Sequence, residues 1–136
     1  MVADTLVDRK VEASERLAKE LIGRGGPLLA AYWDFREEVG QWVLVLVPTS
    51  PKEERRLIEQ ATALLVEAPY RSVFSLSDPA VDSGQIERAR ALGGYIRIVP
   101  YVGRRIDTTY TDGQFFESVV PVYFRPDLMT HLQVAS

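Results

Sequence analysis

Residues 28–48 read LLAAYWDFREEVGQWVLVLVP, and the other predicted elements are organised around this stretch. Two apolar runs, each with one tryptophan, are joined by a short charged segment that ends at Gly40. Apolar side chains alternate onto both sides of each run, which is typical of strands that are covered on both faces. The stretch therefore predicts a buried β-hairpin whose second strand lies at the centre of a sheet. Trp33 and Trp42 are then expected to be core residues.

Helical patterns flank this hairpin. Apolar residues recur at intervals of three and four over residues 4–22, which predicts an amphipathic helix that the glycine-rich segment 23–27 ends. After the hairpin, residues 50–53 read SPKE. This predicts a helix start with Ser50 as N-cap, a proline in the first turn and Glu53 closing a capping box. The apolar stripe of that helix continues to Pro69.

The second half of the chain alternates short elements. The pattern predicts a strand over residues 72–76, a helix over 84–92 that Gly93 and Gly94 stop, and a strand over 95–101. Asp112-Gly113 is the signature of a two-residue type I′ turn, so residues 106–111 and 114–124 are expected to pair as a second hairpin. A short helical turn is expected over residues 128–134.

These elements follow one another in the order α-ββ-α-β-α-β-ββ. Strands 41–47, 72–76 and 95–101 are separated by helices, which predicts two successive β-α-β units with parallel pairing, and the hairpins add antiparallel neighbours. We therefore expect one α/β domain over residues 1–136, with an α+β-like mixed sheet of five to six strands and helices on its faces.

Composition narrows the function classes. The 136 residues are 46% apolar and 26% charged, which is typical of a globular domain with one core. The absence of cysteine excludes disulfides, thiolate metal sites and cysteine nucleophiles. A net charge of −3 makes a nucleic-acid-binding surface unexpected. The N-terminus lacks an apolar signal region, and the longest aliphatic run falls short of the ~20 residues of a membrane span, so a cytoplasmic protein is expected.

The hairpin also carries a resemblance. Residues 30–33, AAYW, followed by 41–48, QWVLVLVP, and a charged helix are similar to a group of small bacterial proteins of unknown function. In that group a tryptophan-containing hairpin that ends in proline precedes a helix and further strands. The resemblance covers about residues 21–77 and rests on hydrophobic pattern. It implies the architecture and no activity.

Catalytic constellations are scarce. The single histidine, His131, would have to carry any catalytic triad or histidine metal site, and its place in the C-terminal tail favours an ordinary surface or packing role. A metal-dependent nuclease needs two acids and a lysine on neighbouring strands. Asp107 and Glu117 are expected nearly opposite each other on the second hairpin, as an acid pair or as solvated edge charges. No lysine accompanies them, so the nuclease is the third alternative, and no catalytic residue, metal or cofactor is assigned.

A small-ligand site is the second alternative. In open α/β sheets, ligands bind beyond the carboxyl ends of parallel strands and beside helix N-termini. The loops 48–51 and 77–84 are expected at such places, where their hydroxyl and N–H groups would suit a small anion or would simply cap the following helices. The candidate ligand-binding residues are Thr49, Ser50, Asp78, Ser83 and Gly84.

The leading interpretation is a non-enzymatic interaction or regulatory module that self-associates as a homodimer. The final hairpin is rich in aromatic residues and has apolar side chains on both faces of a potential sheet edge. A second copy would cover such an edge. The candidate interface residues are Tyr110, Phe115, Phe116, Tyr123 and Phe124.

Overall fold

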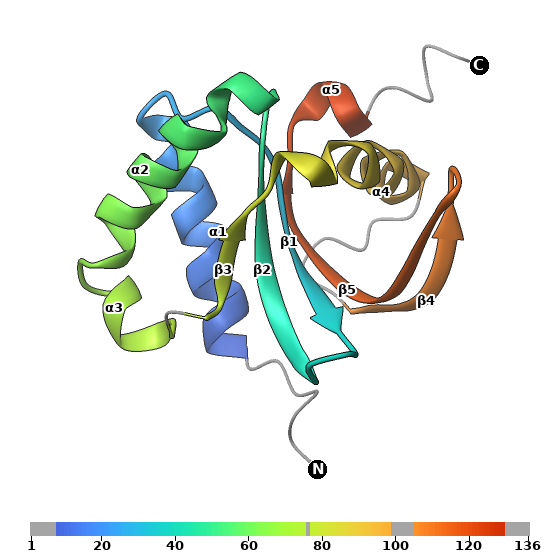
Figure 1. Cartoon of the computed structure of the whole chain (residues 1–136), viewed down its shortest axis with the longest axis horizontal. Helices are drawn as coiled ribbons and strands as arrows, with labels where there is room; N and C mark the ends of the chain where they lie inside the picture. Colours follow the sequence, from blue (N-terminus) through green and yellow to red (C-terminus); the bar gives the residue numbers. More distant parts are fainter. Residues whose placement is uncertain (1–7, 76, 99–104, 130–136) are drawn as a thin grey trace.

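A five-stranded mixed sheet with the strand order β3-β2-β1-β5-β4 organises the molecule (Figure 1). The computed structural model describes residues 8–75, 77–98 and 105–129. The strands are β1 Leu28–Arg36, β2 Gln41–Pro48, β3 Pro79–Val81, β4 Ile106–Thr111 and β5 Gln114–Phe124. The helices are α1 Asp8–Gly23, α2 Glu54–Leu65, α3 Tyr70–Val73, α4 Ile86–Ile98 and α5 Pro126–Met129, with 3₁₀ turns at Pro51–Glu53 (η1) and Ser83–Gln85 (η2). The predicted α/β domain with a mixed sheet is confirmed.

The tryptophan hairpin is the middle of the sheet. β1 and β2 pair antiparallel, with Trp33 opposite Leu44 and Phe35 opposite Trp42. Trp33 is fully buried and Trp42 is 5% exposed, so the prediction that both are core residues is confirmed. The central position belongs to β1, and not to β2 as predicted, because β5 returns to pair with the free side of β1.

Two layers of helices cover the sheet, one on each face (Figure 1). Apolar residues of α1, α2 and α3 form one core with Trp33 and Leu44. Those of α4 and α5 form a second core with Tyr32, Val45 and the curled β4–β5 hairpin. Both faces of the first hairpin are thus covered by helices, as strands with apolar side chains on both faces require.

The glycine-rich end of α1 is placed as predicted. Gly25 has a φ of +74°, and a Cβ on Gly26 would lie 2.7 Å from the backbone oxygen of Leu21. The predicted start of the next helix is confirmed only in part. Ser50 precedes η1, but its side chain makes no capping hydrogen bond, and the Glu53 carboxylate lies 3.3 Å from Arg56 instead. The predicted capping box is wrong.

The predicted strand over residues 72–76 is also wrong. Tyr70–Val73 forms the single turn of α3, and the third strand is Pro79–Val81. Long-range packing selects the helical turn, because Tyr70 is buried, stacks on Phe74 and donates its hydroxyl hydrogen bond to Glu20 of α1. Local β propensity is a weaker preference than these contacts.

α4 continues through Gly93 and Gly94, where the pattern predicted its end. A Cβ on Gly93 would lie 3.1 Å from the Leu128 Cβ and 3.4 Å from the Phe124 ring, so the glycine allows α4 to approach the C-terminal segment closely. Residues 95–98 are therefore helical rather than part of the predicted strand, whose remaining residues lie outside the described part of the chain. Within the described ranges the only parallel pair is β2 with β3, and the predicted second β-α-β unit is not formed.

The second hairpin is confirmed at its turn. Asp112 and Gly113 have φ angles of 49° and 78°, as a type I′ turn requires, and Tyr110 lies opposite Phe115. β5 continues beyond β4 to pair with β1, so this hairpin forms one end of the sheet. The short helix α5 overlaps the start of the expected segment 128–134. Residues 130–134 of that segment lie outside the described part of the chain.

Candidate functional site

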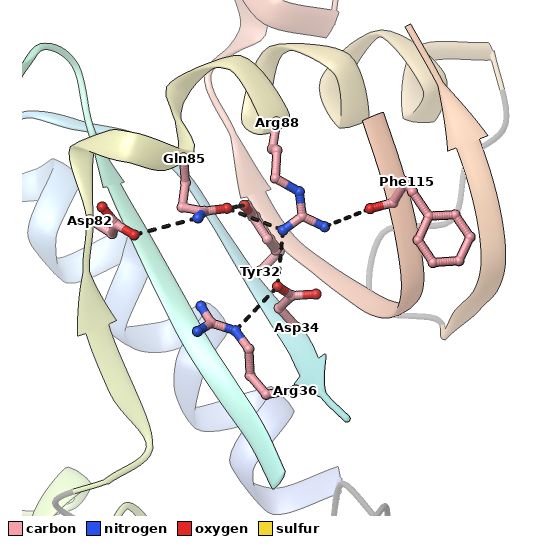
Figure 2. A network of polar contacts seen from close by, with 7 residues as sticks. All are labelled: Tyr32, Asp34, Arg36, Asp82, Gln85, Arg88 and Phe115. Carbon is pink, nitrogen blue, oxygen red and sulfur yellow. Dashed lines mark hydrogen bonds and ion pairs between the residues drawn. The ribbon is translucent and has the colours of Figure 1, made fainter. Parts of the chain in front are cut away.

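A polar network lies where β1, α4 and β5 meet (Figure 2). Its centre is the buried carboxylate of Asp34, which lies on the same face of β1 as Tyr32. Asp34 Oδ2 lies 3.1 Å from Arg88 Nη1 and 3.5 Å from Arg36 Nε. One buried negative charge is therefore compensated by two guanidinium groups from different elements.

Arg88 connects this network to the second hairpin. Nη1 also donates to Gln85 Oε1 at 3.2 Å, and Nη2 donates to the backbone oxygen of Phe115 at 2.9 Å. The guanidinium carbon lies 4.2 Å from the centre of the Phe116 ring. Figure 2 shows Phe115 with its ring turned away from Arg88. These contacts join Arg88 to other groups of the same domain, and they hold the second hairpin against α4.

The hydroxyl of Tyr32 closes the network from below the helix. It donates to Gln85 Oε1 at 3.1 Å, and Gln85 Nε2 donates to Asp82 Oδ2 at 3.4 Å. Burial raises the pKa of the Tyr32 hydroxyl well above its usual range. Tyr32 therefore acts as a neutral hydrogen-bond donor at neutral pH, and the arrangement is that of a structural connector.

The predicted ligand loops are divided between the two ends of the parallel pair. Thr49 and Ser50 follow β2, and Ser83 and Gly84 follow β3 at the same edge of the sheet. Asp78 lies at the other end of β3, where its carboxylate is 2.8 Å from Lys10 Nζ. The structure does not bring all five candidate residues together.

The N–H groups at the carboxyl edge already have acidic partners. Ser83 N donates to Glu54 Oε1 at 2.7 Å, and Gly84 N donates to Asp82 Oδ1 at 2.8 Å. These are the groups that an anionic ligand would use. Two carboxylates occupy them in this structure.

The expected acid pair on the second hairpin does not form. Asp107 lies opposite Ser118, so Glu117 is displaced by one residue and its side chain points to the other face of the strand. Hydrogen bonds from Ser118 Oγ and from Arg105, both at 2.7 Å, lower the pKa of the Asp107 carboxyl. Loss of hydration, together with neighbouring Glu37, raises the pKa of Glu117.

The aromatic residues of the second hairpin have different environments. Phe116 and Phe124 are buried, and both rings contact Tyr32. Tyr123 is half-buried, and burial raises the pKa of its hydroxyl. Tyr110 is 72% exposed and Phe115 is 52% exposed. Of the five candidate interface residues, only these two present most of an aromatic ring to solvent.

Sequence reasoning missed an apolar groove between α2, α3 and the edge strand β3. Its volume is about 720 Å³, and apolar side chains from all three elements line it. The sequence pattern predicts a strand where α3 lies, so it gives no indication of this groove. The one local signal is Ile58, which belongs to the apolar stripe of α2 and yet is 41% exposed.

The described part of the chain contains neither a metal-binding cluster nor a membrane-spanning helix. Over residues 8–75, 77–98 and 105–129, no three acidic or histidine side chains are grouped so that they could hold a metal ion. His131 lies outside these ranges. None of the helices within them combines the length and apolar character needed to cross a bilayer.

Comparison with known proteins gives no match. No family model, no curated protein and no solved structure is significantly similar to this chain. The resemblance of the first hairpin to small bacterial proteins of unknown function stays a prediction.

Proposed function

We propose that this domain is a non-catalytic interaction module that self-associates as a homodimer through strand β4. The observation that carries the proposal is the exposed aromatic pair formed by Tyr110 on the edge strand β4 and Phe115 opposite it on β5. β4 pairs with β5 on one side, and in the described structure no strand pairs with its other side.

The edge of β4 offers backbone groups for a further strand. Thr111 and Gln114 flank the two-residue turn and form a hydrogen-bonded pair, so the N–H and C=O groups of Tyr110 point away from β5. Residues 108–111 read TTYT and contain neither a charge nor a proline. Edge strands usually carry a charged residue or a proline, which prevents pairing with another chain. Thr108 has a φ of 44°, so the extended part of this edge that is suited to pair with a second copy is residues 109–111.

A two-fold axis beside Tyr110 gives a consistent antiparallel pairing. The outward-facing backbone groups of the two β4 strands would then meet, and the two Tyr110 side chains would lie side by side. In this register Thr109 faces Thr111 of the other copy, and the acidic residues Asp107 and Asp112 lie outside the paired segment. Because no carboxylate opposes another, the register avoids like-charge repulsion.

Size-exclusion chromatography with light scattering tests the proposal. The wild-type protein is expected to be a dimer at tens of micromolar, and Tyr110→Lys a monomer, because two lysines would face each other across the axis. Val39→Lys is the matched control, since Val39 is 64% exposed in the turn between β1 and β2. It should leave the dimer intact. A wild-type monomer at this concentration would overturn the proposal.

A further inference from the structure

The groove between α2, α3 and β3 lies at the opposite edge of the sheet from β4 (Figure 1). Its floor consists of Leu46 and Ala61, which are 1% and 2% exposed. Its walls include Ile58 and Val66, which are 41% and 59% exposed. The groove is thus separate from the surface of the proposed self-association.

The groove is open because the elements beside it are short. β3 has three residues and α3 has four, so they leave part of the surface between β2 and α2 uncovered. Phe74 is only half-buried there. Contiguous apolar surface of this kind on a small protein marks a binding site more often than a scattered apolar residue does.

One charge accompanies this apolar surface. Among the described residues that line the groove, only Arg71 is ionisable. Arg71 is exposed, and none of the ion pairs formed within the described ranges involves it. The hydroxyl groups of Thr62 and Ser75 also line the groove. The site therefore combines a mostly apolar lining with a single cation.

From this combination we infer that the groove binds an amphiphile with one unbranched hydrocarbon chain and an anionic head. The chain lies over Leu46 and Ala61, and the head group pairs with Arg71. The volume of about 720 Å³ falls within the range of small-molecule sites, roughly 300–1,000 Å³. Charge complementarity selects the anionic head, because a cationic head would meet the Arg71 guanidinium.

Calorimetric titration with dodecanoate, below its critical micelle concentration, is the first test. Saturable binding of one dodecanoate per chain is expected. Over octanoate, decanoate and dodecanoate the Kd should fall about fourfold for each added methylene that enters the groove. Dodecyltrimethylammonium has the same chain with a cationic head, and it should bind more weakly.

Paired variants locate the site. Thr62→Trp places a large ring in the groove and should abolish dodecanoate binding. Ala63→Trp is the matched control, because Ala63 is exposed on the same helix and is not a lining residue, so binding should persist. Arg71→Gln should raise the Kd of dodecanoate about fivefold, the effect of one partly exposed ion pair, and should not weaken binding of the cationic amphiphile.

Circular dichroism and thermal unfolding show whether each variant is folded. If Thr62→Trp does not fold, the comparison of the two head groups on wild type and Arg71→Gln decides the question. The inference is overturned if dodecanoate shows no saturable binding. Equal affinity for the two head groups, or unchanged affinity in folded Thr62→Trp, would also overturn it.

Discussion

Asp34 joins the central strand β1 to helix α4 through a buried carboxylate. Its buried carboxylate is paired with Arg36 of the same strand and with Arg88 of α4. Arg88 then reaches the backbone of Phe115 on β5. A single side chain therefore couples the central strand to a helix that is more than fifty residues away in the chain, and through it to the second hairpin.

Removal of this carboxylate should be costly. Asp34→Ala leaves two guanidinium groups without their partner, and Arg88 is only 22% exposed, so we expect a loss of about 2–3 kcal/mol in unfolding free energy. Urea denaturation measures it. Glu59→Ala is the control, because its ion pair with Arg55 is exposed and its loss should cost less than about 0.5 kcal/mol. Equal effects of the two substitutions would show that the Asp34 network adds nothing.

Asp107 should make stability depend on pH. Its pKa is lowered in the folded state by Ser118 and Arg105, so the ionised form contributes stability above the ordinary carboxyl pKa of about 4. That contribution is lost as the pH falls through the lower folded-state value. Asp107→Asn should therefore be less stable than wild type at pH 7, and the difference should shrink toward pH 3. Urea unfolding at several pH values checks this; a difference that does not change with pH contradicts it.

At the scale of elements, α4 is the helix whose length local rules misjudge. Gly93 and Gly94 predict an end, yet the helix continues to Ile98. The second core supplies the reason, because Gly93 lies against Leu128 and Phe124. In contrast, the turn at Asp112-Gly113 is predicted correctly, since its two positive φ angles are a local requirement that few residues meet.

Two helical glycines should respond differently to the same substitution. Gly93→Leu forces a side chain between α4 and α5, and we expect a loss of about 1–3 kcal/mol in unfolding free energy. Gly23→Leu, at the end of α1, meets no atom within 4 Å of its Cβ and should be tolerated. Thermal unfolding compares the two. A well-tolerated Gly93→Leu would mean that the close approach does not constrain the helix.

For the whole molecule, Trp33 connects the sheet to its largest covering layer. Its ring is fully buried in the core shared with α1, α2 and α3, and its Nε1 donates to Ser14 Oγ at 3.0 Å. Trp42 lies in the same core, with the Arg105 guanidinium 5.3 Å from the centre of its ring. Both tryptophans are thus structural, and the two candidate binding surfaces lie elsewhere, at the opposite edges of the sheet.

Truncation of either tryptophan should reduce global stability. Trp33→Ala or Trp42→Ala is expected to lower the unfolding free energy by about 3–5 kcal/mol through loss of buried surface and creation of a cavity. Chemical denaturation followed by circular dichroism measures this loss. A variant with native stability that has lost only a binding activity would overturn the assignment of these residues to the core.

Local sequence patterns correctly predict the two hairpins, their turns, α1, a helix after Ser50 and the burial of both tryptophans. These features depend on periodicity and turn chemistry within a few residues. Tertiary packing instead sets the helical turn Tyr70–Val73 and the continuation of α4 beyond Gly93, because contacts with Glu20 and with Leu128 override local preference there. Both candidate surfaces depend on strand order and on packing between distant segments. Periodicity specifies which face a residue occupies, but it does not specify which elements become neighbours.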